Sequence, residues 1–321
     1  MSQNRNPKYD VVIVGGGAAG LSAAVSLCRS LRSVLVVDAG APRNRQAAGV
    51  HGFLSREGMA PAELLAAGRE EVRAHGGELI TGKAVSATTG QDGFTVLLQD
   101  GRMMDSRRLL IASGFEDQLP EVAGVEERWG RDVLHCPYCH GWEIRHRAIG
   151  ILATEPSAAQ EALLLRQWSH TVTFFQHAMP TPSAEDLEQL NARSVGIIEG
   201  QVQSLQIVDD KLTGVALESG RVVPCEALFV SPRPRAQSPF LQSLGLQEEN
   251  ADGVTGQYLK TDASGQTAVP GVWAAGNVTD PSVQLVTAAS AGIVTASAIN
   301  ADLVAEDTRH AVDAAKQVAL S

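Results

Sequence analysis

The hydrophobic pattern at the start of the chain alternates between strand-like and helix-like segments. Residues 9–14 are almost wholly apolar, residues 15–20 are rich in glycine, and residues 21–30 mix apolar and small side chains with polar ones at helical spacing. A second apolar run at 34–37 ends at Asp38. A strand, a glycine turn, a helix and a strand within about thirty residues predict a βαβ unit, and therefore the start of a parallel sheet.

The segments that follow predict a helix and then a small antiparallel insert. Residues 62–75 place apolar side chains among polar ones in the pattern of an amphipathic helix. Short strands are predicted at 94–98 and 109–111, with turn residues before each of them. Consecutive short strands joined by turns favour antiparallel pairing.

The same order of strand, helix, strand and short strands occurs a second time along the chain. An apolar strand at 148–152 leads into a helix at 157–167 and a strand at 172–175. Short strands follow again, at 196–198, 202–208 and 215–218, and the series ends at 228–230. The sequence therefore predicts a second unit of the same kind.

The end of the chain returns to the first unit. A proline-rich stretch at 232–234 leads to a strand that ends in the segment 271–276 and to a closing helix at about 283–303. The Ala-rich residues from there to 321 are expected to be either helical or loose. The prediction is an α/β protein with two Rossmann-like three-layer domains, the second inserted in the first, each with a small antiparallel insert. The first domain would comprise 1–117 and 241–321, and the second 118–240.

The first glycine turn has the spacing of a dinucleotide-binding motif. Gly15, Gly17 and Gly20 form GxGxxG directly after a strand and before a helix, and Asp38 ends the next strand. The first glycine allows the tight turn, the second lets the backbone approach a pyrophosphate, and the third lets the helix pack on the strand. An acid at Asp38 can accept a hydrogen bond from a ribose hydroxyl. The alternative is an ordinary glycine-rich turn, and the glycines alone do not distinguish FAD from NAD.

Composition and charge narrow the class of protein. The 321 residues include 36 acidic and 26 basic side chains, a formal net charge of -10, which disfavours nucleic acid as a partner. No apolar stretch reaches the roughly 18 residues of a membrane helix, and the first ten residues lack the apolar core of a signal peptide. We expect a cytoplasmic protein with no membrane partner.

Two of the four cysteines form the motif Cys136-Pro137-Tyr138-Cys139. Two intervening residues let a turn bring the sulfurs to bonding distance, and a helix that starts there would lower the pKa of one thiol. A zinc site that adds His135 and His140 is an alternative, but four ligands from six residues would be strained and no second pair exists, so no metal is predicted. A thioredoxin-fold active site and a structural disulfide are further alternatives. Cys28 and Cys225 fit buried positions.

A segment near the end of the chain indicates which dinucleotide binds. Residues 274–278 end a strand at a glycine, and residues 282–289 open a helix whose first amides would face an anionic ring edge, as a reduced flavin needs. With this segment, the glycine turn, residues 111–114 and the cysteine pair, the chain resembles the low-molecular-weight thioredoxin reductases of the pyridine nucleotide-disulfide oxidoreductase superfamily. The resemblance covers residues 9–303 and implies FAD as cofactor and a homodimer.

The resemblance also implies which residues hold FAD. Asn277 departs from the family pattern, which has Asp at that position, but an amide still donates and accepts hydrogen bonds. Arg43 and Asn44 follow the second strand and either contact the adenosine part or begin a loop. The implied FAD residues are Gly15, Gly17, Gly20, Asp38, Ser113, Gly114, Gly276, Asn277 and Gln284, with Arg43 and Asn44 as further candidates.

Roles within the redox motif follow from the same resemblance. Cys139 would be the sulfur next to the flavin, and Cys136 the one that exchanges with the external substrate. His140 stands where many thioredoxin reductases have Asp, so it is the candidate proton donor and acceptor. His51 either lies near the flavin or is a surface or core histidine.

The second βαβ unit lacks its own glycine motif. Ala153, Thr154 and Glu155 stand where the family has glycines, and Glu155 would put a carboxylate where a pyrophosphate belongs. After the next strand come Gln176 and His177, where the family has a basic cluster for the 2′-phosphate. We expect weak or absent NADPH binding, although a divergent turn with other contacts is the alternative.

These features together predict an FAD-dependent thiol-disulfide oxidoreductase that acts on a thioredoxin-like protein or a small dithiol. The chain is similar to the dithiol oxidases that close disulfides in gliotoxin-type and holomycin-type natural products, and to nicotinamide-independent thioredoxin reductases. The oxidase direction is favoured, because a net charge of -10 makes docking of an acidic ferredoxin less natural. A reductase fed by another donor, and a zinc- or flavin-binding interaction module, are the alternatives.

Overall fold

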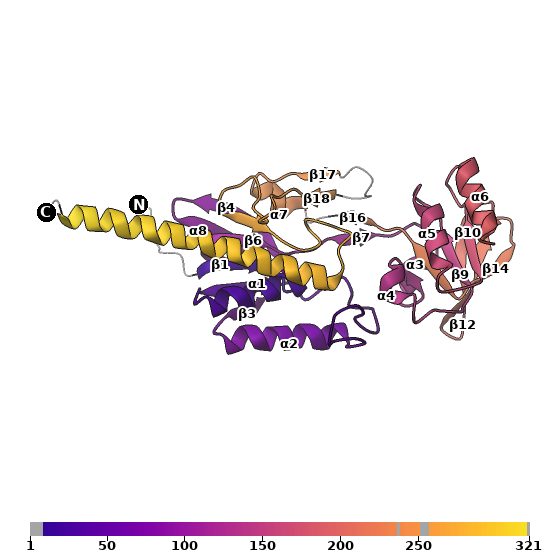
Figure 1. Ribbon diagram of the computed structural model, residues 1–321, viewed down its shortest axis with the longest axis horizontal. Coiled ribbons are helices and arrows are strands. Elements are labelled where there is room, and N and C mark those ends of the chain that lie inside the picture. The colour runs from indigo at the N-terminus through magenta and orange to yellow at the C-terminus, as the bar shows by residue number, and fades with distance from the viewer. Residues whose placement is uncertain (1–8, 236–237, 251–256, 320–321) are drawn as a thin grey trace. The chain divides into compact units, whose positions relative to one another are not determined.

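The computed structural model describes residues 9–235, 238–250 and 257–319 (Figure 1). The chain forms two compact units: unit 1 comprises 1–45, 62–116 and 234–321, and unit 2 comprises 46–61 and 117–233. The predicted borders are 117/118 and 240/241. The sequence did not predict that 46–61 groups with unit 2.

Unit 1 is built on a sheet of parallel strands in the order β3-β2-β1-β6, with β19 beside β6. Their bounds are β3 Glu78–Thr81, β2 Val34–Asp38, β1 Tyr9–Val14, β6 Met103–Ile111 and β19 Val272–Ala274. The residues of β1, β2 and β19 and the last three residues of β6 are almost all buried, so they read as continuous apolar runs in the sequence, whereas the edge strand β3 is partly exposed. Parallel pairing brings the carboxyl ends of all these strands to one edge.

One face of this sheet is covered by helices α1 (Ala18–Arg29), α2 (Pro61–Ala74) and α8 (Leu285–Ala319). The helices α1 and α8 approach closely, since a Cβ added at Gly292 would lie 2.1 Å from the carbonyl oxygen of Ala19. The three-layer arrangement predicted for this unit is thus confirmed on its helical side.

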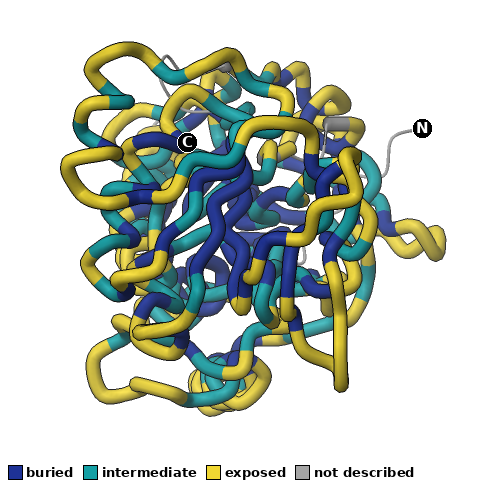
Figure 2. Tube along the Cα trace, turned by 90° about the vertical axis from the view of Figure 1, so that its right-hand side faces the viewer, coloured by how far each residue is buried: buried dark blue, intermediate teal, exposed yellow. Residues whose placement is uncertain are grey.

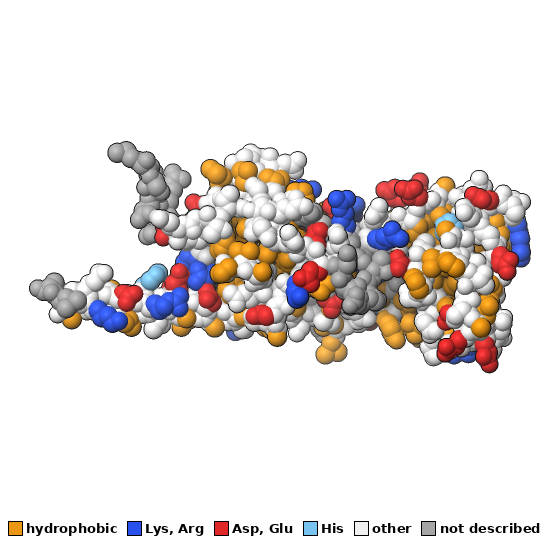
Figure 3. Space-filling view, turned by 90° about the horizontal axis from the view of Figure 1, so that it is seen from above, with side chains coloured by type: hydrophobic (Ala, Val, Ile, Leu, Met, Phe, Trp, Pro, Cys, Tyr) orange, Lys and Arg blue, Asp and Glu red, His pale blue; other side chains and the backbone are white. Residues whose placement is uncertain are grey.

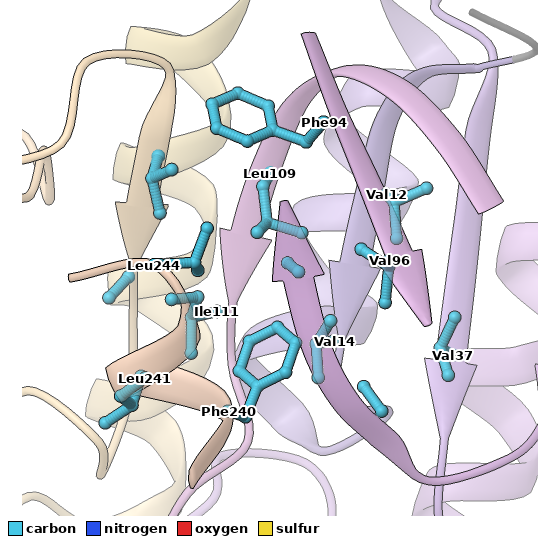
Figure 4. Packing of buried hydrophobic residues seen from close by; sticks show 14 of the residues in the cluster. Val12, Val14, Val37, Phe94, Val96, Leu109, Ile111, Phe240, Leu241 and Leu244 are labelled. Carbon is cyan, nitrogen blue, oxygen red and sulfur yellow. The ribbon is translucent and has the colours of Figure 1, made fainter. Parts of the chain in front are cut away.

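The other face is covered by an antiparallel meander and by α7 (Ser238–Ser243). Strand β5 (Gly93–Leu98) pairs antiparallel with the first half of β6, and β4 (Ala84–Gly90) pairs antiparallel with β5. Figure 4 shows Phe94 and Val96 of the meander and Phe240 of α7 with the strand residues that they cover. The predicted antiparallel insert is this meander. The short hairpin of β17 (Glu248–Asn250) and β18 (Gln257–Leu259) follows α7.

Unit 2 repeats this layered plan. Its parallel sheet has the order β11-β10-β9-β15-β8. Figure 2 shows buried segments of the chain enclosed by exposed loops. Helices α5 and α6 cover one face, and the antiparallel strands β12, β13 and β14 cover the other. The bounds are β8 Val133–Leu134, β9 Ile149–Leu152, β10 Val172–Phe175, β11 Gly196–Ile198, β12 Val202–Val208, β13 Lys211–Leu217, β14 Val222–Pro224, β15 Ala227–Val230, α3 Val125–Arg128, α4 Pro137–His140, α5 Ala158–Leu165 and α6 Ala184–Ala192.

The chain changes unit at β7 (Glu116–Gln118) and β16 (Arg233–Arg235), which pair with each other. The strands predicted at 172–175, 196–198 and 202–208 have the observed bounds. The closing helix is longer than 283–303: α8 continues to Ala319, so of the two alternatives for the Ala-rich end, the helical one holds as far as Ala319.

Ion pairs hold the middle of α8 to unit 1. Arg107 lies 2.8 Å from Asp10 and 2.7 Å from Glu306, and Arg108 lies 2.5 Å from Asp302. Within the described part of the chain, α8 is the one helix long and apolar enough to cross a membrane. However, α8 packs one face against α1 and forms these ion pairs, as a helix within a folded domain does.

Candidate active site

The turn between β1 and α1 requires glycine at two points. Gly15 has a φ of 114°, and a Cβ there would lie 2.2 Å from the carbonyl oxygen of Ala112. A Cβ on Gly20 would lie 1.9 Å from the carbonyl oxygen of Gly15. The turn therefore passes under the end of β6 with α1 directly against it, as a pyrophosphate-binding turn does.

Gly17, in contrast to Gly15 and Gly20, faces open space. A Cβ added at Gly17 would meet nothing within 4 Å, and Gly17 is the N-cap of α1 without a side-chain cap. The first amides of α1 have no intrahelical acceptor, and they carry the positive end of the helix dipole. This open cradle fits the pyrophosphate of a dinucleotide.

Asp38 ends β2 beside this turn. A Cβ on Gly16 would lie 2.7 Å from the Asp38 carboxylate, which shows how closely the two approach. The Asp38 Oδ1 accepts from the amide of Gly40 at 3.1 Å, and Arg69 lies 3.8 Å from Oδ2. A carboxylate fixed at this edge of the sheet can accept from ribose hydroxyls.

The segment near the end of the chain that was predicted to face the flavin, here called the distal segment (274–284), crosses the start of α1. Gly276 has a φ of 83°, and a Cβ there would lie 2.8 Å from that of Ala19. The Asn277 amide donates to the carbonyl oxygens of Asp280, at 3.3 Å, and Val283, at 3.1 Å, and so orders the loop that precedes α8. Gln284 ends this loop, and its carbonyl accepts the amide of Ala288.

Other predicted FAD residues lie in the same unit. The end of β6 continues to Ser113 and to Gly114, which has a φ of 64°. Arg43 stacks over the ring of Phe115, 4.4 Å from its centroid, and Asn44 lies in the turn after it. The structure brings the glycine turn, Asp38 and the distal segment together in unit 1, while the role of each residue in FAD binding stays a prediction.

The redox motif forms a short helical turn in unit 2. Cys136 is the N-cap of α4, its Sγ accepts the amide of Cys139 at 3.2 Å, and the two cysteines form a disulfide with Cα atoms 5.2 Å apart. Pro137 is the first helical residue, where its missing N–H is no loss. The cysteines are half-buried, while Tyr138 and Trp142 are exposed.

His140 follows Cys139 at the end of this turn. Burial lowers the pKa of His140, and the positive charge of His51 lowers it further, whereas Glu143 opposes both effects. A histidine shifted in this direction is neutral near pH 7 and can accept a proton. This fits the proton-carrying role that the resemblance implies for His140.

His51 also belongs to unit 2 and lies between two carboxylates. Its Nδ1 is 2.6 Å from Glu57, and its Nε2 is 3.6 Å from Glu143. Sequence reasoning left His51 open between a flavin contact and a surface position, and it missed both carboxylates. Glu143 is part of the Cys-Pro-Tyr-Cys-His-Gly-Trp-Glu run, so its place beside the cysteines was the available signal.

The turn after β9 contrasts with the turn after β1. Glu155 is largely buried and lies 3.8 Å from Arg233. The Thr154 hydroxyl and one Glu161 carboxylate oxygen are buried without a hydrogen-bond partner. Burial raises the pKa of Glu161 to about 7. The Nδ1 of His177 accepts a hydrogen bond from the amide of Val202 at 3.1 Å, and this bond ties the turn after β10 to the start of β12.

The remaining cysteines are free and buried. Burial raises the pKa of Cys28 and raises that of Cys225 to about 12, so both are held as unreactive thiols. Among residues 9–235, 238–250 and 257–319, no group of three or more His, Cys, Asp or Glu side chains could hold a metal ion.

Comparison with known proteins identifies the family. A model of the pyridine nucleotide-disulphide oxidoreductases matches residues 9–292. The chain belongs to this family. It is a thioredoxin reductase-like oxidoreductase acting on sulfur groups, with FAD as its cofactor, so the predicted family, enzyme class and cofactor are confirmed.

Relatives and solved structures agree with this assignment. The chain is 28% identical to thioredoxin reductase sirT of Leptosphaeria maculans, covering 93% of this chain and 95% of that protein. It is 28% identical to thioredoxin reductase tcpT of Claviceps purpurea, covering 84% and 86%. The crystal structure of HlmI matches with a TM-score of 0.91 and 46% identity over 97% of both chains. The putative thioredoxin reductase TrxB of Bacillus anthracis matches with a TM-score of 0.86 and 26% identity, covering 92% and 99%.

Proposed function

We propose that this flavoprotein is a dithiol oxidase that does not use NADPH. The observation that carries the proposal is the turn after β9, where Ala153, Thr154 and Glu155 replace the glycines of a nucleotide-binding turn. The resemblance of the redox motif to that of dithiol oxidases supports the same direction.

The electrostatics of that turn disfavour a nucleotide. Glu155 is largely buried, so its repulsion of a pyrophosphate would be little screened and on the order of several kcal/mol. Arg233 is mostly exposed and lies 3.8 Å from Glu155, which compensates part of this charge. Glu161 adds a second carboxyl in the first turn of α5, where a phosphate would need the helix amides.

The proposed chemistry uses the disulfide of unit 2. A substrate thiolate attacks the Sγ of Cys136, and Cys139 leaves as a thiolate. The second substrate thiolate then attacks the substrate sulfur of this mixed disulfide, so that the substrate disulfide forms and Cys136 leaves as a thiolate. Both substrate protons are released, and His140 accepts a proton from an attacking thiol. When bound, FAD would supply the two-electron acceptor for the reduced cysteines, and oxygen would be the final oxidant.

The test compares electron donors anaerobically. The yellow protein is mixed with NADPH or with dithiothreitol while the flavin absorbance is followed. We expect dithiothreitol to bleach the flavin and micromolar NADPH to leave it unchanged, and admission of oxygen to restore the colour with one peroxide per disulfide formed. Rapid bleaching by micromolar NADPH would contradict the proposal.

The names of the relatives favour a second candidate. Several are thioredoxin reductases, so a thioredoxin-like protein is the alternative substrate, reduced by electrons from a donor other than NADPH. Photoreduced enzyme mixed anaerobically with oxidised thioredoxin distinguishes the two. Rapid reappearance of the flavin colour with formation of thioredoxin thiols would favour this candidate over the oxidase.

We further propose that the enzyme is a homodimer that pairs through α8. Ile293, Val304 and Val312 are about half exposed, and a repeat of 3.6 residues places them on the face of α8 opposite Ile299 and Leu303, which are buried. Figure 3 shows hydrophobic side chains between charged ones along the C-terminal end of this helix.

A second copy fits this strip best. Exposed Val286 and Val318 continue the strip over most of α8, so it is about 50 Å long. A two-fold axis lays the strip against itself, and a face of this length and about 10 Å wide buries on the order of 1,000 Å² over both copies, the lower limit for a specific interface. In sedimentation equilibrium, wild type should be a dimer and Val304→Asp with Val312→Asp a monomer. Arg309→Asp, on the charged side of α8, is the matched control and should stay dimeric.

A further inference from the structure

The segment 50–59 is a closed loop that fixes the His51 ring. The Val50 amide donates to the carbonyl of Met59 and the Gly58 amide to that of Val50, both at 2.8 Å. Inside the loop, Glu57 accepts the amide of Gly52 at 3.0 Å and holds the Nδ1 of His51 at 2.6 Å. These bonds lower the pKa of Glu57, with the His51 bond as the largest cause. The carboxylate therefore orients the imidazole, as an orienting acid does in a catalytic triad.

The other ring nitrogen faces the redox motif. His51 Nε2 lies 3.6 Å from Glu143, and the amide of Glu143 donates to the carbonyl of His140 at 3.1 Å. Glu143 thus belongs to the same turn as His140 and the cysteines. The His51 side chain is only 17% exposed, so its charge is less screened than that of a surface histidine.

We propose that His51 is a positioning residue for the thiol chemistry: held between Glu57 and Glu143 beside the redox motif, its imidazolium form opposes protonation of His140, the base that accepts a thiol proton. The inference rests on the redox role of the cysteines in the proposed function, but not on the electron acceptor or on NADPH. A single base that must take substrate protons works best when it is unprotonated at the working pH.

The charges around His140 define the direction of the effect. His51 opposes protonation of His140, while Glu143, from the same turn, favours it, and burial opposes it. Glu57 acts on His140 through His51, and the disulfide carries no charge. Without the positive charge of His51, only burial opposes the effect of Glu143, so the pKa of His140 should rise.

The experiment uses full-length holoenzyme with ¹³C-labelled histidine in the oxidised state. His51→Gln removes the charge and should raise the titration midpoint of His140 by about half a unit or more, and His51→Lys, which keeps the charge, should leave it within about 0.2 units of wild type. His75→Gln, on an exposed histidine of unit 1, is the matched control and should change nothing.

A second readout is the rate at which dithiothreitol reduces the Cys136–Cys139 disulfide, measured anaerobically by rapid alkylation. The acid limb of its pH profile should move up in His51→Gln, with a loss of about threefold at pH 6 relative to pH 8, and His51→Lys should restore it. Equal titration of His140 in wild type and His51→Gln would overturn the inference, even if both variants were less stable. Failure of dithiothreitol to reduce the wild-type disulfide would instead overturn the proposed function, because the histidine titration does not depend on it.

Discussion

The turn after β1 and the turn after β9 occupy the same place in two units with the same arrangement of layers. Their residues differ in kind, however: the first turn is built from glycines and the second carries a carboxylate. After β1, Gly15 and Gly20 leave no room for a Cβ, and Gly17 opens onto free space. After β9, Ala153 is buried, and Glu155 fills the turn with a carboxylate. Strands β1 and β9, which precede the two turns, are both almost wholly buried.

The difference shows that the sheet and helix of a Rossmann-like unit depend on core packing, whereas the turn between them does not. Ile149 and Ile151 pack against α5 as Val11 and Ile13 pack against α1, so the sheet and its helix persist through burial alone. The turn contributes little to that core. It can therefore lose its glycines when no nucleotide has to approach the backbone, and unit 2 keeps its part in the reaction through the disulfide.

The largest expected effect comes from breaking the first turn. Gly15→Ala would place a Cβ 2.2 Å from the Ala112 carbonyl oxygen at a φ of 114°, which costs on the order of several kcal/mol. We expect purified protein with less than about a tenth of the wild-type flavin-to-protein absorbance ratio and a lower Tm. The matched change in the second turn, Ala153→Gly, should keep full flavin content. Equal flavin loss in both variants would remove the contrast between the turns.

The next effect tests the disulfide as the working part of unit 2. Cys136→Ser should lower dithiol oxidation by about 10³-fold or more, measured as oxygen uptake with dithiothreitol, because no sulfur remains for the substrate to attack. Cys28→Ala, at a free buried thiol, is the control and should keep most of the activity.

The separate roles of the two cysteines can be tested by trapping. In Cys139→Ser, the remaining Cys136 should form a mixed disulfide with a small disulfide reagent, seen as added mass. In Cys136→Ser, the remaining Cys139 should react more slowly. The reverse order would exchange the two assigned roles.

A smaller effect probes the buried carboxyl of the second turn. Because burial raises the pKa of Glu161 from 4.5 to about 7, the folded state binds the proton more tightly, and stability falls as the pH rises from 4.5 to 7. The loss at pH 8 is about 3 kcal/mol. Glu161→Gln should remove this loss and raise the Tm at pH 8 but hardly at pH 4.5. A variant less stable than wild type at pH 8 would show that the carboxylate has a partner there.

The smallest effect concerns the ion pairs of α8 in unit 1. Burial alone would raise the pKa of Glu306, but the hydrogen bond from Arg107 and the charge of Arg108 outweigh it and lower the pKa. Stability from this pair is present above the ordinary pKa of 4.5 and is lost as the pH falls below it. Glu306→Gln should cost about 1 kcal/mol or less at pH 7, after solvent screening, and nothing at pH 3. Thermal unfolding at the two pH values checks this.

Local patterns in the sequence predicted most of the fold. The apolar runs of β1, β2, β9 and β10 and the glycine spacing are short-range signals, and they are where the structure agrees best. Beyond 303 the sequence left the chain open between a helix and a loose end, because polar residues such as Glu306 and Asp307 interrupt the apolar pattern, and their ion-pair partners are almost two hundred residues or more away.

The site was predictable to the same extent. Cys136, Cys139 and His140 are contiguous and visible in one motif, whereas the contact of Glu143 with His51 joins residues 92 positions apart and has no local pattern. The grouping of 46–61 with unit 2 is equally non-local. Sequence spacing shows which residues carry chemistry, but not which distant charges tune them.

The burial of the two spare cysteines has a consequence for an enzyme that would generate peroxide. Peroxide attacks thiolates, and Cys28 and Cys225 stay protonated inside the two cores. Among the four cysteines, only the two that perform the exchange are then open to oxidation, and in this structure they are bonded to each other.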